Sequence, residues 1–190
     1  MDYKELDNVD KRILTEIYKD GTQNPFQLST KIKKDNGNFM SHVAIGRRIK
    51  KLQEASIVKI QGNINFSALK FKVALFFVGF KNYSFSLEFL EKHANCPRIF
   101  FITKLTGEFH LLIGIIGKNL KDLNDFINCC FLSNSDPINK SSTIFSSESI
   151  KPDFISVNIF DQNFINSNCV KNCNDCVSYQ KELCKGCVFF

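Results

Sequence analysis

The stretch SHVAIGRRIKKLQEA, residues 41–55, decides the fold of the first part of the chain. At about 100° per residue, Ile45, Ile49 and Leu52 fall within one narrow stripe, which is typical of a helix that packs on other helices. The opposite side is basic, with Arg47, Lys50 and Lys51 at its centre and Arg48 on the flank. The sequence therefore predicts an amphipathic helix with one buried face and one exposed, basic face.

Two shorter helices are predicted before this stretch. Asp7 can cap the first helix, which we expect to run to Lys19. Asn24, followed by Pro25 and by Gln27, is typical of the start of a second helix. The three helices together indicate a helix-turn-helix arrangement.

Turn signals separate and follow these helices. The dipeptide Asn36-Gly37 predicts a turn between the second helix and the third. After the third helix, the stretch Ile57-Val58-Lys59-Ile60, a turn at Gly62 and then Ile64 predict a small wing or hairpin. We therefore expect a winged variant of the helix-turn-helix.

The middle of the chain predicts a sheet with two helices. The near-continuous apolar run KVALFFVGF, residues 72–80, is typical of a strand covered on both faces. The elements expected after it are a helix at 84–93, strands at 98–104 and 109–116, a helix at 119–131 and a last strand at 141–151. The order β-α-β-β-α-β is that of the ferredoxin-like unit, so we expect an α+β protein. The apolar strand faces suggest that two such sheets pack together in a dimer.

The positive charge is concentrated in one segment. The net charge of +6 comes from 25 Lys and Arg against 19 Asp and Glu. Residues 31–59 hold eight of these bases and two acids, which is again +6 and leaves 17 of each elsewhere. A basic block on a neutral body is typical of a phosphate-binding surface, so we expect double-stranded DNA as a partner. A merely solvated helix face, or one that binds protein, is the alternative.

Composition bounds the class of protein. A chain of 190 residues with 44% hydrophobic and 23% charged residues fits one large or two small globular domains. No apolar run reaches the roughly 20 residues needed to span a bilayer. Positions 1–20 also lack the apolar block of a secretory signal. We therefore expect a cytoplasmic protein with no membrane partner.

Several stretches resemble the Lrp/AsnC (feast/famine) family of transcription regulators. The run LDNVDKRIL, residues 6–14, resembles the opening of that family. The pattern S-x3-I-x2-RI-x2-L, residues 41–52, resembles its third helix. The run TGEFH, residues 106–110, resembles the turn between the middle strands of its regulatory domain. The match extends over about residues 6–151 in the family's element order.

This resemblance implies a homo-oligomeric regulator without catalytic activity, built from a DNA-binding domain and a ferredoxin-like domain that dimerises. Such dimers assemble further and bind a small-molecule effector, typically an amino acid, near Thr106, Gly107 and His110. The groove-facing set implied by position is Ser41, His42, Ala44, Arg47 and Arg48, with Lys50 and Lys51 as phosphate contacts. Two recognition helices one helical turn apart can read a pseudo-palindrome.

The chain departs from the family pattern in its turns. The turn between the second and third helices, residues 33–40, is several residues longer than usual. Ser56 and Phe71 stand where the family commonly has glycine. His110 replaces the usual aspartate of the effector turn.

A related branch supplies an enzyme alternative. Siroheme decarboxylases resemble this family but bind a tetrapyrrole between the two domains and remove its carboxylates. Such an enzyme needs basic residues for the carboxylates and a histidine near the pocket. This chain has three histidines, and its basic excess lies on the helix expected to face DNA. The sequence therefore favours the regulator.

The C-terminal segment leaves the family pattern and is rich in cysteine. Its core is Cys173-x2-Cys176-x7-Cys184-x2-Cys187, with Cys169 upstream as an alternate ligand. Two CxxC pairs can each offer two thiolates, and four thiolates satisfy tetrahedral zinc. Zinc is the favoured cofactor, and an iron–sulfur cluster or redox-active thiols are the alternatives. Besides the regulator and the tetrapyrrole enzyme, a third functional hypothesis is a metal- or redox-responsive module that binds a partner through this segment.

These observations divide the chain into four segments. We expect a helix-turn-helix domain over residues 1–60, a linker hairpin over 61–71, a ferredoxin-like regulatory and oligomerisation domain over 72–152 and a cysteine-rich extension over 153–190. Apolar residues in 153–168 predict one more strand or docking segment.

Overall fold

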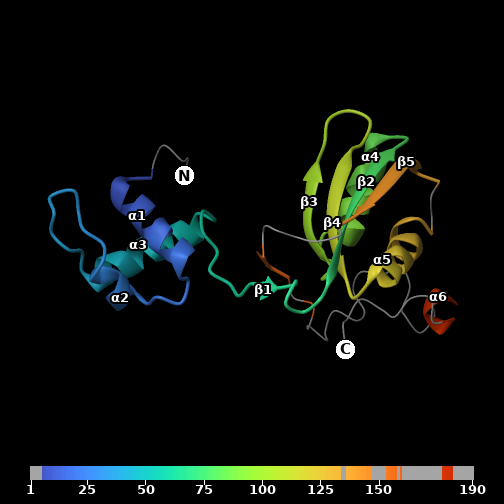
Figure 1. Ribbon diagram of the computed structural model, residues 1–190. Coiled ribbons are helices and arrows are strands. Elements are labelled where there is room, and N and C mark those ends of the chain that lie inside the picture. Colours follow the sequence, from blue (N-terminus) through green and yellow to red (C-terminus); the bar gives the residue numbers. More distant parts are fainter. Residues whose placement is uncertain (1–5, 134–135, 147–152, 158, 160–176, 182–190) are drawn as a thin grey trace. The chain divides into compact units, whose positions relative to one another are not determined.

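The protein divides into two compact units, Met1–Gly62 and Asn63–Phe190. The computed structural model describes residues 6–133, 136–146, 153–157, 159 and 177–181 (Figure 1). Each unit has its own hydrophobic core, so each is described by itself.

The first unit consists of helices, and the first two begin at the capping residues predicted. Its helices are α1 (Asn8–Lys19), α2 (Pro25–Ser29) and α3 (His42–Glu54). Asp7 accepts a hydrogen bond from the Asp10 N–H, and Asn24 and Gln27 form a reciprocal capping box. Ser41 caps α3 by accepting from the Ala44 N–H at 3.3 Å. Side-chain caps satisfy backbone donors that a helix start leaves without partners, which fixes where each helix begins.

The core of the helical unit lies where the three helices meet. Ile13, Leu28 and Ile45 are fully buried there, one from each helix. Burial of a side chain of this size contributes about 1.5–3 kcal/mol. Ile45 and Leu52 belong to the predicted apolar stripe, which therefore holds α3 in place and leaves its other side exposed.

The hairpin predicted around Gly62 is wrong. Ile57 and Val58 pack against the helical core instead of forming a strand. Gly62 does not adopt the positive φ that tight hairpin turns use. The strand that follows, β1 (Ile64–Asn65), pairs antiparallel with β6 (Phe154–Ile155). The local sequence pattern could not indicate a partner so distant along the chain.

The second unit contains a four-stranded antiparallel sheet. Its strands are β2 (Lys72–Phe80), β3 (Ile99–Lys104), β4 (Leu111–Gly117) and β5 (Ile138–Phe145), in the spatial order β3-β4-β2-β5. Helix α4 (Tyr83–His93) connects β2 to β3, and α5 (Leu120–Phe126) continues into a π-helical turn, Ile127–Phe131, before β5. The order along the chain is thus the predicted β-α-β-β-α-β, and the mixed α+β class is confirmed.

The last strand of this sheet starts and ends earlier than predicted. It was expected at 141–151, but β5 begins at Ile138, opposite Phe80 of β2. A register shift between Gly79 and Phe80 accompanies this pairing, and β5 ends at Phe145. The apolar pattern missed the first residues of β5 because most of that strand is exposed and polar.

Both helices cover the same face of the sheet. Phe89 of α4 and Phe126 of α5 share one core with Phe76 and Val78 of β2. Alternate residues of a strand point to one side, so Phe76 and Val78 define the helix-covered face. The segment around β1 and β6 packs at the other face, where Ile155 joins Val73 in a smaller core.

Candidate nucleic-acid interface

The exposed face of α3 carries most of the predicted DNA-contacting residues. Ser41, His42, Arg47, Lys50 and Lys51 are exposed, and Ala44 is half-buried. Ala44 packs against the helical core, so this predicted groove contact does not lie on the exposed face. The other five residues lie off the stripe formed by Ile45 and Leu52, which faces the core. Arg47, Lys50 and Lys51 are therefore exposed on a helix that opens with the exposed polar residues Ser41 and His42.

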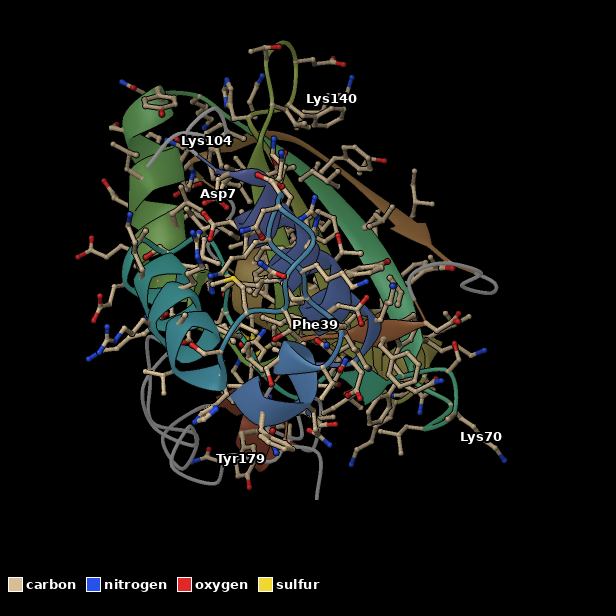
Figure 2. All side chains as sticks on the ribbon, turned by 90° about the vertical axis from the view of Figure 1, so that its left-hand side faces the viewer. Asp7, Phe39, Lys70, Lys104, Lys140 and Tyr179 are labelled. Carbon is tan, nitrogen blue, oxygen red and sulfur yellow. The ribbon has the colours of Figure 1, made fainter. Side chains whose placement is uncertain are left out.

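Arg48 departs from this set. Its Nη1 donates to Asp7 Oδ2 at 2.6 Å and to Asp10 Oδ1 at 2.7 Å, which ties α3 to the start of α1. Figure 2 shows Asp7 at that end of α1. Arg47 and Arg48 are neighbours in sequence, but about 100° of helix rotation sends one to solvent and the other to two carboxylates.

The pKa values of Asp7 and Arg48 are both shifted from their ordinary values. Burial raises the pKa of Asp7, but hydrogen bonds from the Asp10 N–H and from Arg48 lower it by more, so it lies below its ordinary value. Burial lowers the pKa of Arg48, but its bonds to Asp10 and Asp7 raise it above the ordinary value. Asp7 and Arg48 are therefore both charged at neutral pH, and their ion pair links α1 to α3.

Two exposed apolar side chains near the start of α3 were missed by the sequence reasoning. Val43 is 50% exposed, and Phe26 of α2 is 66% exposed. The Phe26 ring centroid lies 6.3 Å from that of His42. The rotation of about 200° between Val43 and Ile45 is the signal that would have placed Val43 on the outer face.

The predicted effector residues lie in the turn between β3 and β4. Thr106 and Gly107 are exposed at its tip, whereas His110 is half-buried. The His110 Nδ1 accepts a hydrogen bond from the Phe80 N–H at 2.9 Å, and its ring stacks on that of Phe80. His110 therefore holds the base of the turn, whereas Thr106 and Gly107 form its exposed tip.

Two further contacts fix the path of this turn. The Glu108 carboxylate pairs with the Lys140 ammonium of β5, at the end of the sheet where Figure 2 labels Lys140. A Cβ built on Gly79 would lie 2.5 Å from the Glu108 carbonyl oxygen. The backbone of the turn crosses β2 at that point, and only glycine leaves room for it.

The predicted cysteine ligands, Cys169, Cys173, Cys176, Cys184 and Cys187, lie outside the described residues. Helix α6 (Val177–Gln180) is described and lies within the spacer between the two CxxC pairs. Within the described part of the chain, no group of three or more His, Cys, Asp or Glu could hold a metal ion. No described helix is long and apolar enough to cross a membrane.

Comparison with known proteins identifies the family. The HTH-type transcriptional regulator FL11 of Pyrococcus furiosus is 30% identical over 125 residues, which cover 65% of this chain and 78% of that protein. The chain belongs to the Lrp/AsnC family of transcription regulators. The leucine-responsive regulatory protein of Rhizobium meliloti is a second member, 28% identical over 127 residues, with the same coverage of 65% and 78%. No family model matches the chain.

Solved structures of other proteins share the fold, including that of E. coli AsnC. The transcriptional regulator NMB0573 of Neisseria meningitidis, solved in complex with L-Met, superposes with a TM-score of 0.65 at 21% identity. The match covers 77% of this chain and 93% of the neisserial one. As an Lrp/AsnC member, the chain is a DNA-binding transcription regulator, and the prediction that it is not an enzyme is confirmed by its relatives.

Proposed function

We propose that this Lrp/AsnC member is a sequence-specific regulator whose α3 enters the major groove of DNA. The observation that carries the proposal is the two-sided character of α3. Ile45 and Leu52 anchor one side in the core, while Arg47, Lys50 and Lys51 are exposed on the other. In this reading the helical unit is of the helix-turn-helix type, and the sheet unit is ferredoxin-like.

The exposed residues of α3 divide into base-reading and phosphate-binding groups. The first turn of a recognition helix lies closest to the base edges, which assigns Ser41, His42 and Val43 to the bases. The Val43 side chain suits a thymine methyl group, and the Arg47 guanidinium suits guanine O6 and N7. Lys50 and Lys51 follow toward the end of α3 and suit the phosphates. Arg48 positions α3 through its carboxylate partners instead of contacting DNA.

We infer that the face of the sheet away from the helices receives a second copy of this chain. Leu75, Phe77 and Leu112 are only half-buried there, and Ile144 is 54% exposed. The strand pairing places all four on one side of the sheet, because Leu75 lies opposite Ile144 and Phe77 opposite Leu112. A two-fold axis makes such a surface self-complementary and gives the dimer two copies of α3 for a pseudo-palindromic site.

The salt dependence of DNA binding tests the α3 assignment. A duplex is selected from a random pool by the parent protein, and its affinity is measured across a salt series. Each neutralised phosphate contributes about 0.9 to the slope of log affinity against log salt. Replacing Arg47 and Lys51 by alanine should weaken binding and flatten this slope. A double variant of equal charge change, Lys81→Ala with Lys92→Ala on exposed lysines of the sheet unit, should bind like the parent.

A parent-like slope for the Arg47 and Lys51 variant would contradict the assigned surface.

The oligomer is tested separately by sedimentation, in which Phe77→Glu should produce monomers because a charge would then lie in the apolar interface. A monomeric parent would contradict the assigned dimer face.

We further propose a small-molecule site of the amino-acid class at the Thr106–His110 turn. The fixed path of the turn supports it, since Gly79 and Lys140 hold the backbone and side chain of Glu108. Calorimetry with a panel of free amino acids should reveal saturable binding. Gly79→Ala should abolish it by displacing the turn, whereas Gly62→Ala, which meets open space, should not. A panel in which no amino acid binds would contradict the proposal.

We also propose that Cys173, Cys176, Cys184 and Cys187 hold structural zinc. Two observations support it: the paired CxxC spacing and the helical turn α6 between the pairs. Protein purified without air should be colourless and contain about one zinc per chain, as four thiolates fill one tetrahedral site. Brown protein would instead indicate an iron–sulfur cluster. Metal-free protein with titratable thiols would favour redox chemistry, and Cys169 would then join the candidates.

A further inference from the structure

The chain between α2 and α3 forms a hairpin of its own. Residues Lys33 and Phe39 make an antiparallel bridge, and the Lys34 N–H donates to the Asn38 carbonyl at 2.8 Å. Gly37 adopts a φ of +83°, a conformation that glycine reaches without strain. In Figure 1 this segment stands out from the helices as the loop at the outer edge of the first unit. We call residues 33–39 the α2–α3 hairpin.

The α2–α3 hairpin is fastened to the helical unit at its base and on one side. The Met40 N–H donates to the Ile32 carbonyl at 3.0 Å, so the two ends of the hairpin meet directly before the Ser41 cap of α3. Arg12 of α1 donates from Nη1 to the Lys33 carbonyl at 2.6 Å, and its Nη2 lies 3.1 Å from Asp35 Oδ1. These bonds hold the hairpin beside the N-terminal end of α3.

The α2–α3 hairpin presents positive charge to solvent. Lys33 and Lys34 are exposed, and the Lys33 ammonium lies 5.0 Å from the centroid of the exposed Phe39 ring. Asp35 is neutralised by Arg12, so the hairpin and its anchor together carry three bases against one acid, a net charge of +2. Figure 2 shows Phe39 on the side of the unit that faces the viewer.

These lysines add positive charge next to the part of α3 that has none. The first turns of α3 contain no lysine or arginine between Ser41 and Gly46, and its basic residues begin at Arg47. The α2–α3 hairpin places Lys33 and Lys34 next to the end of α3 that lacks them. Exposed positive charge is therefore also present directly before the N-terminus of α3, which is the end of a recognition helix that contacts base edges.

We propose that the α2–α3 hairpin is a second DNA-contacting element, in which Lys33 and Lys34 bind phosphates flanking the groove that α3 enters. The proposal rests on the proposed function, because it requires α3 to face DNA. Phosphate contacts position a protein on the duplex and add affinity without reading sequence. The hairpin thus lengthens the footprint of each subunit and strengthens binding equally at all sites.

The test uses the full chain and the duplex selected by the parent protein. Lys33→Ala with Lys34→Ala should lower the salt slope by about 1.8 per bound subunit, because two phosphate contacts are lost. Hydroxyl-radical footprinting should show loss of backbone protection at the outer edges of the site only. Lys33→Arg with Lys34→Arg should restore both readouts, and Lys81→Ala with Lys92→Ala should leave them unchanged as the charge-matched control.

The outcomes separate the hairpin from α3. A hairpin variant that keeps the parent slope and footprint overturns the inference, provided that Arg47→Ala with Lys51→Ala lowers the slope. Parent-like binding by both variants overturns the proposed function itself. A hairpin variant that selects different base sequences also overturns the inference, because the hairpin would then read bases or steer α3. Circular dichroism of each variant establishes that the helical unit is folded.

Discussion

Each unit contains an arginine that ties two elements together, but the two arginines lie at different depths. The Arg98 side chain, just before β3, is 2% exposed, with Nη2 lying 2.6 Å from Asp122 Oδ2 of α5. Its Nε donates to the Ile116 carbonyl, and its guanidinium lies 4.2 Å from the Phe126 ring centroid. The Arg48 side chain in the helical unit is 33% exposed and relies on two carboxylates.

The difference shows what a buried charge needs. At Arg98, a carboxylate, a carbonyl and an aromatic face replace water together, which is the condition under which a protein interior tolerates a guanidinium. At Arg48, water still reaches the group, so each ion pair is partly screened. We therefore expect the sheet unit to depend on its arginine more strongly than the helical unit does.

The largest expected effect comes from Arg98→Met. The substitution keeps much of the apolar stem but leaves Asp122 without its cation, and breaking a buried pair costs about 3 kcal/mol or more. Hydrogen exchange measured by mass spectrometry should accelerate in β2 and β4 and not in α1 or α3. Parent-like protection of β2 and β4 would show that the buried pair does not hold the sheet unit.

A smaller effect is expected from Arg48→Ala. Loss of its hydrogen bonds to Asp7 and Asp10 should lower the free energy of unfolding of the helical unit by about 1–2 kcal/mol, discounted because the group is one-third exposed. The same exchange experiment should now show faster exchange in α1 and α3 only. An effect as large as that of Arg98→Met would abolish the contrast between the two units.

Acid should weaken the ion pair between Arg48 and Asp7. The pKa of Asp7 in the folded chain lies below its ordinary value of 3.8. Its contribution to stability is therefore fully present well above pH 3.8 and is lost as the pH falls through the lower folded pKa. Asp7→Asn keeps a side-chain cap for α1 but removes the charge. The difference in α1 exchange between parent and variant should shrink as the pH falls from 6 toward about 3; a difference that does not change with pH would contradict this account.

The smallest expected effect concerns two residues with a left-handed backbone conformation, one in each unit. Ser56 after α3 has a φ of 55°, and Lys70 before β2 has a φ of 59°. Glycine at either position should relieve strain that its greater unfolded-state entropy partly offsets, for a net gain of about 0.5 kcal/mol. Calorimetry of Ser56→Gly and Lys70→Gly should show melting temperatures about 1–2 °C higher. A lower melting temperature would mean that these side chains stabilise the folded state by more than the backbone strain destabilises it.

Much of the helical unit was predictable because its signals are local. Caps at Asp7, Asn24 and Ser41 and the stripe of Ile45 and Leu52 depend on residues within one or two turns. The order of strands and helices in the sheet unit followed from apolar runs in the same way. Such signals give the element order because hydrogen bonds and periodic burial are set by near neighbours.

The predictions that failed, or that the sequence could not make, concern partners distant along the chain. The sequence placed Arg48 with Arg47 in the groove-facing set, yet Asp7 and Asp10 draw it to α1. It predicted a hairpin at Gly62, yet β1 pairs with β6. The role of His110 in holding the turn also depends on a bond to Phe80, thirty positions away along the chain.

The sequence by itself determined the family, the order of the elements and the concentration of charge in residues 31–59. The element order and the charge distribution follow from composition and from periodicities shorter than a helix, whereas the family follows from similarity to known members. Only the tertiary structure decided which cations remain available to DNA. A basic side chain is available or paired according to which carboxylates the packing of other elements brings within reach, as Arg47 and Arg48 show.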